Sequence, residues 1–521
     1  MKVVLGAFMN IIIFLLALSP ILWLMIALSL LKLPAFKACP IALAIAIVLS
    51  VTFFKMPAAD CLTGGLEGIA LALWPISLVI LAAIFTYNLC IATGSMDCIK
   101  QILAGVSGDK RILLLIIGWC FGGFMEGMAG FGTAIAIPAS MLCGMGFPPI
   151  AVTAACLVAN ASPTAFGSVG IPTVTAAQIA ELPSGEVAFA AALQLTPFIL
   201  IAPFLMVCII GKSVKALKGV WPVALISGIS FAVPELLAAA FLGAELPVII
   251  GSICSMAITI GVVKKWFKNP DPEYGIEENK SNGKNKITGR EAVKAWMPFL
   301  LIFVFLLLTS PMIPPVNQML SAVKTSVSIY TGEGAKPYTF VWLATPGVLI
   351  AAAAVIGGRI QGADFRLMGK VFISTMKQMW KTILTIVTIL AMSKIMGYSG
   401  MIAAIAGTML ALTGSFYPFA APLVGALGAF VTGSGTSSSV LFGSLQAQTA
   451  ANLGISPVWL VASSTVGATI GKIISPQSIA IGAAAANLLG SESKILNQAV
   501  KFSAAFIIIA GCIAYFGSRV Y

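Results

Sequence analysis

The stretch from Gly122 to Pro172 constrains the fold more than any other part of the chain. It is apolar enough to lie in a lipid bilayer, yet it contains Glu126, a cluster of glycines and a polar turn at residues 160–164. Backbone groups that leave a helix in lipid need other partners, so such a segment has to face protein or a water-filled cavity. The stretch therefore predicts a broken membrane segment that lines a solute-binding site.

Composition places this stretch in a membrane protein. The chain has 521 residues, of which 59% are hydrophobic and 9% are charged, and many apolar runs reach the roughly 20 residues that span a bilayer. We therefore predict an all-α polytopic membrane protein. The net charge is +13, but the basic residues lie mainly in short loops, where they indicate the cytoplasmic side and no nucleic-acid partner. With no histidine and ten cysteines without a CxxC pair, we expect no metal and no cofactor.

The second half of the chain repeats the first. With small gaps, Gly167 and Pro172 match Gly471 and Pro476. Other residues recur at one constant spacing; they pair as Trp74 with Trp380, Gly94 with Gly400, Gly122 with Gly428, Phe124 with Phe430, and Gly127 with Gly433. An ordered series of this kind predicts a duplicated architecture.

The basic loops fix the orientation of the two repeats. If these loops are cytoplasmic, the first broken segment opens to the cytoplasm and the second to the exterior, so the repeats are inverted and both termini lie outside. Inverted repeats with discontinuous helices are typical of secondary transporters. Other inverted hairpin carriers move as elevators, and this analogy is the sole basis for expecting an elevator here.

We predict about twelve membrane spans and two re-entrant hairpins. Residues 1–212 and 290–521 form the two repeats, and residues 213–289 supply two linking helices and a polar cytoplasmic loop. The discontinuous segments are hairpins at about 112–146 and 416–454 and broken helices at about 148–172 and 456–489.

Two charged residues within these broken segments are candidates for function. Glu126 lies in a glycine-rich break, where desolvation favours a protonated acid, so it is a candidate for proton coupling. The alternatives are a buried acid that bonds the hairpin backbone or pairs with a lysine. Lys472 is the candidate partner of an anionic substrate, because an unpaired cation at membrane depth is costly. The alternatives are a fixed ion pair with Glu126 or an ammonium that reaches the membrane interface.

Four segments resemble signature segments of the L-lactate permease family. They are residues 123–132, 159–172, 432–439 and 471–480. The resemblance implies a proton symporter of L-lactate and related 2-hydroxymonocarboxylates such as glycolate, in the bacterial inner membrane. Its partners would be a small monocarboxylate, a proton and the lipid bilayer. The oligomeric state stays open, with a homodimer as one alternative.

Small polar residues in these segments complete the predicted substrate site. Backbone N–H groups in the run from Thr432 to Ser439 can face an anion, although hydroxyl residues also mediate ordinary helix packing. Ser475 and Gln477 can bond the 2-hydroxyl group or cap the helix break. Asp97 and Lys394 are expected at the membrane interface. The polar candidates are Asn160, Ser162, Thr164, Thr436, Ser437, Ser438, Ser475 and Gln477.

Other classes of function fit the sequence less well. An enzyme would need a nucleophile with a base or a metal; the chain has no histidine and no convincing strand to carry a nucleophile elbow. A channel would favour a pore element repeated across subunits. The alternative that stays open is a sodium-coupled di- or monocarboxylate transporter, although one basic residue in the site suits one carboxylate better than two.

Overall fold

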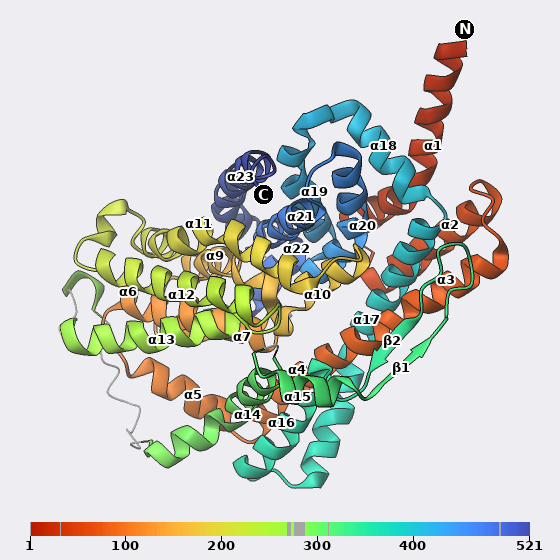
Figure 1. Cartoon of the computed structure of the whole chain (residues 1–521). Helices are drawn as coiled ribbons and strands as arrows, with labels where there is room; N and C mark the ends of the chain where they lie inside the picture. The colour runs from red at the N-terminus through yellow and green to blue at the C-terminus, as the bar shows by residue number, and fades with distance from the viewer. Residues whose placement is uncertain are drawn as a thin grey trace.

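The chain folds almost entirely into helices (Figure 1). The computed structural model describes residues 2–31, 33–130, 132–267, 272–275, 287–310, 312–488 and 491–521. Within these residues, 10 helices are long and apolar enough to cross a membrane, or up to 12 if each of 2 bent helix pairs counts as one span. The prediction of an all-α polytopic membrane protein with broken helices is confirmed.

The first five helices lead to the first hairpin. They are α1 (Lys2–Met25), α2 (Ala35–Thr52), α3 (Ala58–Leu71), α4 (Leu78–Ala92) and α5 (Ser95–Ala104). Between α3 and α4 the helical backbone is interrupted at Trp74, with φ −132° and ψ 115°. Proline at position 75 explains the interruption, because proline lacks the N–H that a continuous helix uses and clashes with the preceding turn.

The segments for which the sequence predicts the first hairpin and broken helix are helical. One arm runs through α6 (Lys110–Leu113), the helical segment Leu114–Phe121 and α7 (Gly122–Met128), and the other is α8 (Thr133–Gly144). The broken helix comprises α9 (Pro149–Ala159), a short turn (Pro163–Phe166) and α10 (Gly167–Ile179), with a bend of 58°. Its second part extends beyond the predicted limit at residue 172. A long helix, α11 (Ser184–Gly211), follows.

The middle of the chain contains the linking helices and a pair of strands that the sequence does not predict. The helices are α12 (Trp221–Phe241), α13 (Pro247–Trp266), α14 (Gly289–Leu308), α15 (Pro314–Ser321) and α16 (Pro346–Gln361). Residues 276–286 of the polar loop lie outside the described residues. The expectation of no convincing strand is wrong here, since β1 (Lys324–Val327) and β2 (Tyr338–Val341) form an antiparallel pair. Strands of four residues are too short for periodicity to reveal.

The second half follows the same order of elements as the first. Its helices are α17 (Phe365–Tyr398), α18 (Met401–Thr413), α19 (Tyr417–Thr432), α20 (Gly435–Leu453), α21 (Pro457–Lys472), α22 (Pro476–Ala485) and α23 (Glu492–Gly517). Helices α19 and α20 form the second hairpin, and α21 and α22 form a broken helix bent by 43°. The repeat boundaries near residues 212 and 290, and the exterior position of both termini, stay predictions.

The two halves pack into each other. Helix α10 of the first half packs on α20 of the second, α22 packs on α8, and α2 and α3 pack along α17 (Figure 1). Glycines allow this close approach: a Cβ atom at Gly68 would lie 2.6 Å from the backbone of Ala391. Small residues serve the same purpose in membrane helices generally. In lipid the hydrophobic effect does not drive helices together, so they associate through close packing of their backbones. This interlocking brings both hairpins and both broken helices together.

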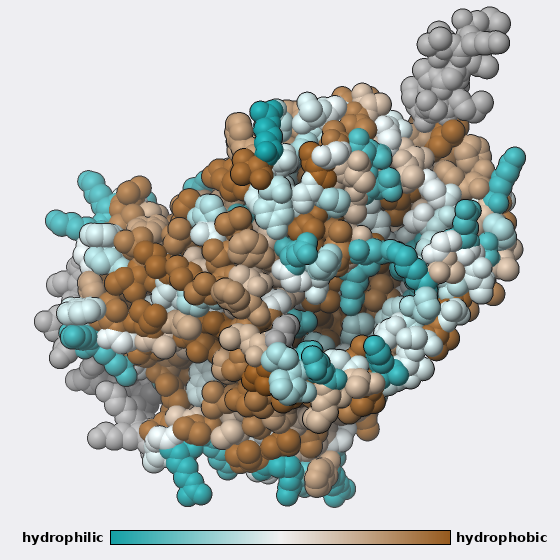
Figure 2. Space-filling model, in the orientation of Figure 1, coloured by the Kyte–Doolittle hydropathy of each residue, from teal (hydrophilic) through white to brown (hydrophobic). Residues whose placement is uncertain are grey.

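Figure 2 shows the surface that follows from this packing. Hydrophobic residues cover much of the visible face of the helical bundle, and hydrophilic residues lie at its margins and in a group right of the centre. Large apolar side chains such as Leu237, Phe241 and Ile508 are exposed. An exposed apolar face of this extent matches contact with lipid.

Candidate functional site

A cavity of about 130 Å³ lies where the two hairpin tips meet the two helix breaks. It is lined by residues from both halves, which include Glu126, Gly130, Gly132, Thr164, Gly167, Ser168, Pro172, Thr432, Gly433, Ser434, Thr436, Ser437, Lys472, Gln477 and Ser478. The start of α2 and the middle of α17 close its remaining side, through Ala35, Thr382, Thr385 and Ile386. The broken segments thus line a cavity, as the sequence predicts for non-helical backbone at membrane depth.

The tips of the hairpins owe their shape to glycine. In the first hairpin Gly130 and Gly132 have φ of 63° and 84°, and in the second Gly433 has φ of 71°. L-residues with a Cβ atom adopt this left-handed region reluctantly, whereas glycine does so without steric cost. At Gly433 a Cβ atom would also meet the Oε1 atom of Gln477 at 2.1 Å. The glycines therefore allow a tight turn and keep the tips close to the opposite broken helix.

The charged core of the cavity is an ion pair between Lys472 and Glu126. The Lys472 Nζ atom lies 2.7 Å from Glu126 Oε1, and the two side chains are 9% and 2% exposed. Lys472 Nζ also lies 3.4 Å from the Thr164 hydroxyl. The second carboxylate oxygen of Glu126 has no hydrogen-bond partner among the described residues. The structure thus shows the Glu126 pairing that the sequence left as one of several alternatives.

Two helix N-termini add partial positive charge to this core. Helix α20 begins at Gly435 and α22 at Pro476, and residues in the first turn of each, Thr436, Ser437, Gln477 and Ser478, line the cavity. The first N–H groups of a helix lack partners within the helix, and the helix dipole favours an anion there. One cation and two helix termini therefore converge on a small space, which is an arrangement suited to a carboxylate.

The repeat places four cavity residues in two matched pairs. In the register that matches Gly127 with Gly433, Glu126 corresponds to Thr432, and in the register that matches Gly167 with Gly471, Ser168 corresponds to Lys472. All four line the same cavity. The two halves thus contribute equivalent positions, but one matched position in each half has become charged. This asymmetry gives the cavity both its acid and its base.

Backbone strain marks the entry of α10 into the cavity. Ser168 and Val169 have φ of 47° and 60°, and Gly170 continues the left-handed run with φ of 77°. A β-branched residue such as valine rarely adopts this conformation, which costs about 1–3 kcal/mol and persists where the surroundings enforce it. Here the Ser168 hydroxyl donates a hydrogen bond of 2.8 Å to the carbonyl of Ala129 at the first hairpin tip. The strained turn therefore ties α10 to the hairpin that carries Glu126.

The structure brings most of the predicted site residues into this cavity. Those that line it are Glu126, Lys472, Thr164, Thr436, Ser437 and Gln477. Asn160 and Ser162 are buried beside it, and their side-chain polar atoms have no hydrogen-bond partner among the described residues. Neither is among the residues that line the cavity.

Two predicted binding residues serve other contacts. The Ser438 hydroxyl donates to the carbonyl of Gly425 at 2.7 Å, so it joins α20 to α19. The Ser475 hydroxyl accepts a hydrogen bond from the Ser478 backbone and caps α22. Ser475 thus caps the helix break, and Ser438 mediates helix packing, which are the roles that the sequence left open beside substrate binding. Contact of either hydroxyl with a substrate stays a prediction, since a hydroxyl has one donor and two acceptor sites.

A second buried ion pair contains Lys394, for which a position at the membrane interface stays a prediction. Its Nζ atom lies 2.8 Å from Glu67 Oε1, and the side chains are only 15% and 7% exposed. Asp97, with a side chain 73% exposed, pairs with Lys100 on the surface. A signal for Glu67 is present in the sequence: it follows two glycines in Gly64-Gly65-Leu66-Glu67-Gly68, much as Glu126 does in its own glycine-rich segment.

A third buried glutamate lies outside these pairs. Glu235 on α12 is 0% exposed, and neither of its carboxylate oxygens has a partner among the described residues. It does not line the cavity that holds Lys472. Glu126 and Glu235 are therefore similarly buried, but of the two only Glu126 lines the cavity.

Comparison with known proteins assigns the family. The family described as L-lactate permease matches residues 13–521. The chain belongs to the L-lactate permease family. An L-lactate permease of Streptococcus iniae is 44% identical over 86% of this chain and 93% of its own length. An L-lactate permease of Escherichia coli strain K12 is 35% identical over 96% of this chain and 94% of its own.

A relative with a different name also matches along most of the permease. The glycolate permease GlcA of Escherichia coli strain K12 is 34% identical over 97% of this chain and 96% of its own. A solved structure, the YdaH transporter of Alcanivorax borkumensis, aligns over 87% of this chain and 86% of its own at 13% identity with a TM-score of 0.44, too low to establish a common fold. The family and the apolar spans identify a transporter, a multi-pass permease of the bacterial plasma membrane.

Proposed function

We propose that this permease imports L-lactate and related 2-hydroxymonocarboxylates such as glycolate by proton symport. The observation that carries the proposal is the Glu126–Lys472 ion pair inside the cavity at the hairpin tips. The names of the relatives supply the substrate class, since they include both lactate and glycolate permeases. Lys472 would bind the substrate carboxylate, and Glu126 would carry the coupling proton.

The size and charge of the cavity support a small monocarboxylate. A water molecule occupies about 30 Å³ in the liquid, so a cavity of about 130 Å³ has room for a molecule with few carbon atoms. Lys472 is the one cation that lines it among the described residues. A second carboxylate would therefore lack a cationic partner, and taking an unpaired ion out of water costs several kcal/mol.

The ion pair explains how substrate and proton would be coupled. In the ion pair, Glu126 binds the ammonium group of Lys472, which is the group that a substrate carboxylate would need. If Glu126 takes a proton, Lys472 becomes free to bind the substrate, and the total charge of lysine, glutamate and substrate stays neutral. Binding the anion without the proton would leave an excess negative charge in a site that is nearly closed to water, which is strongly unfavourable. Proton and substrate would therefore bind together.

The surroundings of the cavity support an elevator movement as the means of alternating access. The hairpin tips and helix breaks form most of its wall, and α2 and α17 form the rest. The two groups of elements meet at the site without sharing a helix, so one group has freedom to slide against the other and carry the substrate. Cysteine pairs between α17 and the hairpin tips that crosslink in two distinct registers would test this movement.

Transport into proteoliposomes tests the function itself. Labelled L-lactate uptake is measured with a proton gradient alone, with a sodium gradient alone and with neither. The proposal predicts accumulation with the proton gradient and none with sodium. Accumulation driven only by sodium would support the alternative of a sodium-coupled carrier, and failure to transport any 2-hydroxymonocarboxylate would contradict the assigned substrate class.

A further inference from the structure

The second buried ion pair repeats the geometry of the first. Glu67 on α3 and Lys394 on α17 are 2.8 Å apart, and the Tyr398 hydroxyl donates to the same Glu67 oxygen at 2.9 Å. Lys394 Nζ lies 3.5 Å from that hydroxyl, as Lys472 Nζ lies 3.4 Å from the hydroxyl of Thr164. In both pairs the second oxygen of the glutamate has no hydrogen-bond partner among the described residues.

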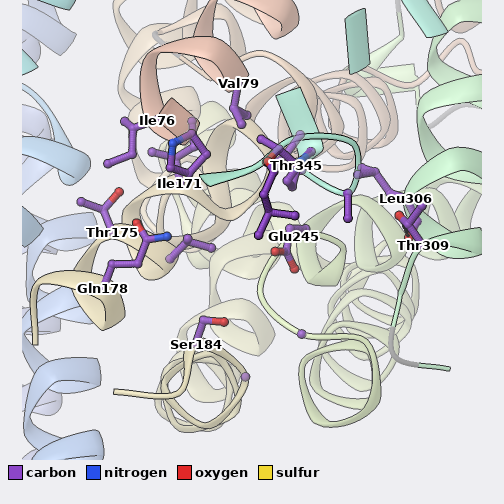
Figure 3. Close-up of a pocket in the computed structure, with 18 of the residues that line it drawn as sticks. Ile76, Val79, Ile171, Thr175, Gln178, Ser184, Glu245, Leu306, Thr309 and Thr345 are labelled. Carbon is purple, nitrogen blue, oxygen red and sulfur yellow. Dashed lines mark hydrogen bonds between the residues drawn. The ribbon is translucent and has the colours of Figure 1, made fainter. Parts of the chain in front are cut away.

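Lys394 lines a large cavity that is separate from the site at the hairpin tips. This cavity has a volume of about 640 Å³ and is bounded by the α3–α4 junction, α10, the loop before α13 and the segments around β2 and α16. We call it the outer cavity. Figure 3 shows Thr175 and Gln178 on one side of it, with Glu245 and Thr345 across from them. Polar groups thus face the cavity from more than one element.

The position of α12 and α13 identifies the side of the membrane to which the outer cavity belongs. Leu242 and Leu246, in the loop between these two helices, line the cavity. At their other ends, α12 begins just after Lys218, and α13 ends with Lys264 and Lys265. Basic loops mark the cytoplasmic side of membrane proteins. The outer cavity therefore lies toward the exterior.

Helix α10 is the wall between the outer cavity and the inner site. Gly167, Ser168 and Pro172 line the cavity with Lys472, whereas Val169 and Thr175 line the outer cavity. The strained left-handed turn at residues 168–170 is thus part of this wall. A solute that reaches the outer cavity is separated from the inner site by the thickness of one helix.

Two buried polar atoms in the outer cavity need a partner. Thr175 is 0% exposed, and its hydroxyl has no hydrogen-bond partner among the described residues. Gln178 is partly buried, and its side-chain carbonyl oxygen is a buried atom that likewise has no hydrogen-bond partner among the described residues. Buried polar groups are normally hydrogen-bonded, and an unpaired one has a cost of about 1–3 kcal/mol. A ligand with hydroxyl and carboxylate groups would supply these bonds.

We propose that Lys394, Thr175 and Gln178 form a second binding position for the transported monocarboxylate, from which the anion passes to Lys472. The proposal rests on the proposed function, because it assigns the same substrate to both positions. A lysine ammonium has three N–H donors, and Glu67 accepts one of them. Glu67 keeps balancing the charge of Lys394, whereas protonation of Glu126 frees Lys472, so an added anion is held more weakly here than at Lys472. Burial raises the pKa of Glu245, which reduces its repulsion of that anion.

Side-specific transport kinetics test the outer position. We expect Lys394→Gln to raise the external KM for L-lactate about tenfold, the scale on which a charged contact affects capture of an anion. In inside-out vesicles, the KM from the cytoplasmic side should change less than about twofold, because that route does not begin at Lys394. The matched control is Lys336→Gln, which removes an exposed lysine that pairs with Glu181 and should change neither value. An unchanged external KM, or an equal rise on both sides, would overturn the proposal.

Binding to a variant without the inner lysine tests the position directly. L-lactate is titrated onto purified Lys472→Gln protein and followed by saturation-transfer NMR. We expect weak binding that disappears in the double variant Lys472→Gln/Lys394→Gln. Absence of weak binding in Lys472→Gln would overturn the second position alone. Wild-type affinity in Lys472→Gln would instead contradict the proposed function, so the two failures are distinguishable.

A substitution of Glu67 separates a binding role from a structural one. Glu67→Gln keeps a polar side chain of the same size but frees the charge of Lys394, so the external KM should fall. A purely structural pair would give the opposite result: Glu67→Gln and Lys394→Gln would lower the melting temperature alike and would not differ in the sign of their effect on KM. That outcome would overturn the proposal.

Discussion

The two buried ion pairs of this permease are alike in chemistry but differ in the backbone that carries them. Each joins a glutamate of the first half to a lysine of the second, Glu126 to Lys472 and Glu67 to Lys394. Glu126 and Lys472 lie at the ends of interrupted helices. Glu67 and Lys394 lie within α3 and α17, several residues from the nearest helix end.

This difference decides what each pair can bind. At a helix break, unpaired N–H groups add to the charge of the lysine, so an anion meets several donors at once. Within a continuous helix the backbone is already hydrogen-bonded, and only side chains are available. Under the proposed function, a buried lysine alone would therefore not make the principal site of this carrier, and the interrupted backbone around Lys472 would be needed as well. Lys394, within a continuous helix, would have the weaker of the two binding roles.

The largest effect is expected where the inner pair is broken at its cation. Lys472→Gln should weaken L-lactate binding about 100-fold or more, because loss of one partner of a buried charge pair costs about 2–5 kcal/mol. Lys472→Arg should bind better than Lys472→Gln but less well than wild type, since the larger guanidinium keeps the charge and alters the fit. Calorimetry on protein shown to be folded provides the measurement. Near wild-type affinity of Lys472→Gln would leave the helix termini as the sole holders of the anion.

The next effect concerns the acid of the inner pair. Glu126→Gln permanently resembles the protonated side chain, so proton-driven accumulation should be lost while exchange of internal for external lactate continues. The matched control is Glu235→Gln, which changes a buried glutamate outside the cavity and should leave accumulation intact. Equal loss of accumulation and exchange in Glu126→Gln would indicate a structural role. Loss of accumulation only in Glu235→Gln would indicate that Glu235 on α12 carries the coupling proton instead.

A smaller effect is expected from the hydroxyl groups beside the two lysines. Thr164→Val removes the hydroxyl near Lys472, and Tyr398→Phe removes the one that donates to Glu67. Each loss should lower stability by about 1–3 kcal/mol, the usual range for hydrogen bonds to charged or buried groups. Only Thr164→Val should also weaken binding from both sides of the membrane. Thermal unfolding and two-sided transport assays measure the two effects, and identical kinetics for both variants would contradict the division of roles.

The sequence predicts the parts of the site that depend on local chemistry. Glycine-rich breaks, the polar turn at residues 160–164 and a charged residue at membrane depth each disturb an apolar run visibly, and they place Glu126 and Lys472 correctly at broken segments. The match of Gly127 with Gly433 likewise predicts the position of the second hairpin from the repeat alone. These features can be recognised in the sequence because non-helical backbone and charged residues are costly at membrane depth and usually occur there for function.

The rest of the site depends on contacts between distant segments, which one sequence does not contain. Whether Lys472 stands alone or pairs with Glu126 depends on how two hairpins fold together. Lys394 resembles an interface residue because hydropathy records its position along α17 but not the facing carboxylate of Glu67. The unpredicted pair β1 and β2 arises for a similar reason, since each short strand is defined by the other. The packing role of Ser438 is hidden in the sequence because its acceptor lies on another helix.

The smallest effect is expected at an exposed ion pair, which serves as a reference for the two buried ones. Lys336 and Glu181 are 2.5 Å apart, with side chains 76% and 52% exposed. The hydrogen bond from the Lys336 ammonium lowers the pKa of Glu181 below its ordinary value of 4.5. A carboxyl with a lowered folded-state pKa contributes stability above its unfolded pKa and loses that contribution as pH falls through the folded value. Water and salt screen this pair, so the contribution should be small.

The melting temperature of a Lys336→Gln variant, measured against pH and salt, tests this contribution to stability. Lys336→Gln should lower the melting temperature slightly at pH 7, and the difference from wild type should vanish as the pH falls below the lowered pKa of Glu181. Added salt should reduce the difference at pH 7 as well, because the charges are exposed to solvent. The two buried pairs should resist salt better, since none of their side chains is more than 15% exposed. If salt weakened the Lys394 pair as readily as the Lys336 pair, as judged by melting of Lys394→Gln against wild type, then Lys394 would be exposed to water and the distinction between buried and surface pairs would fail.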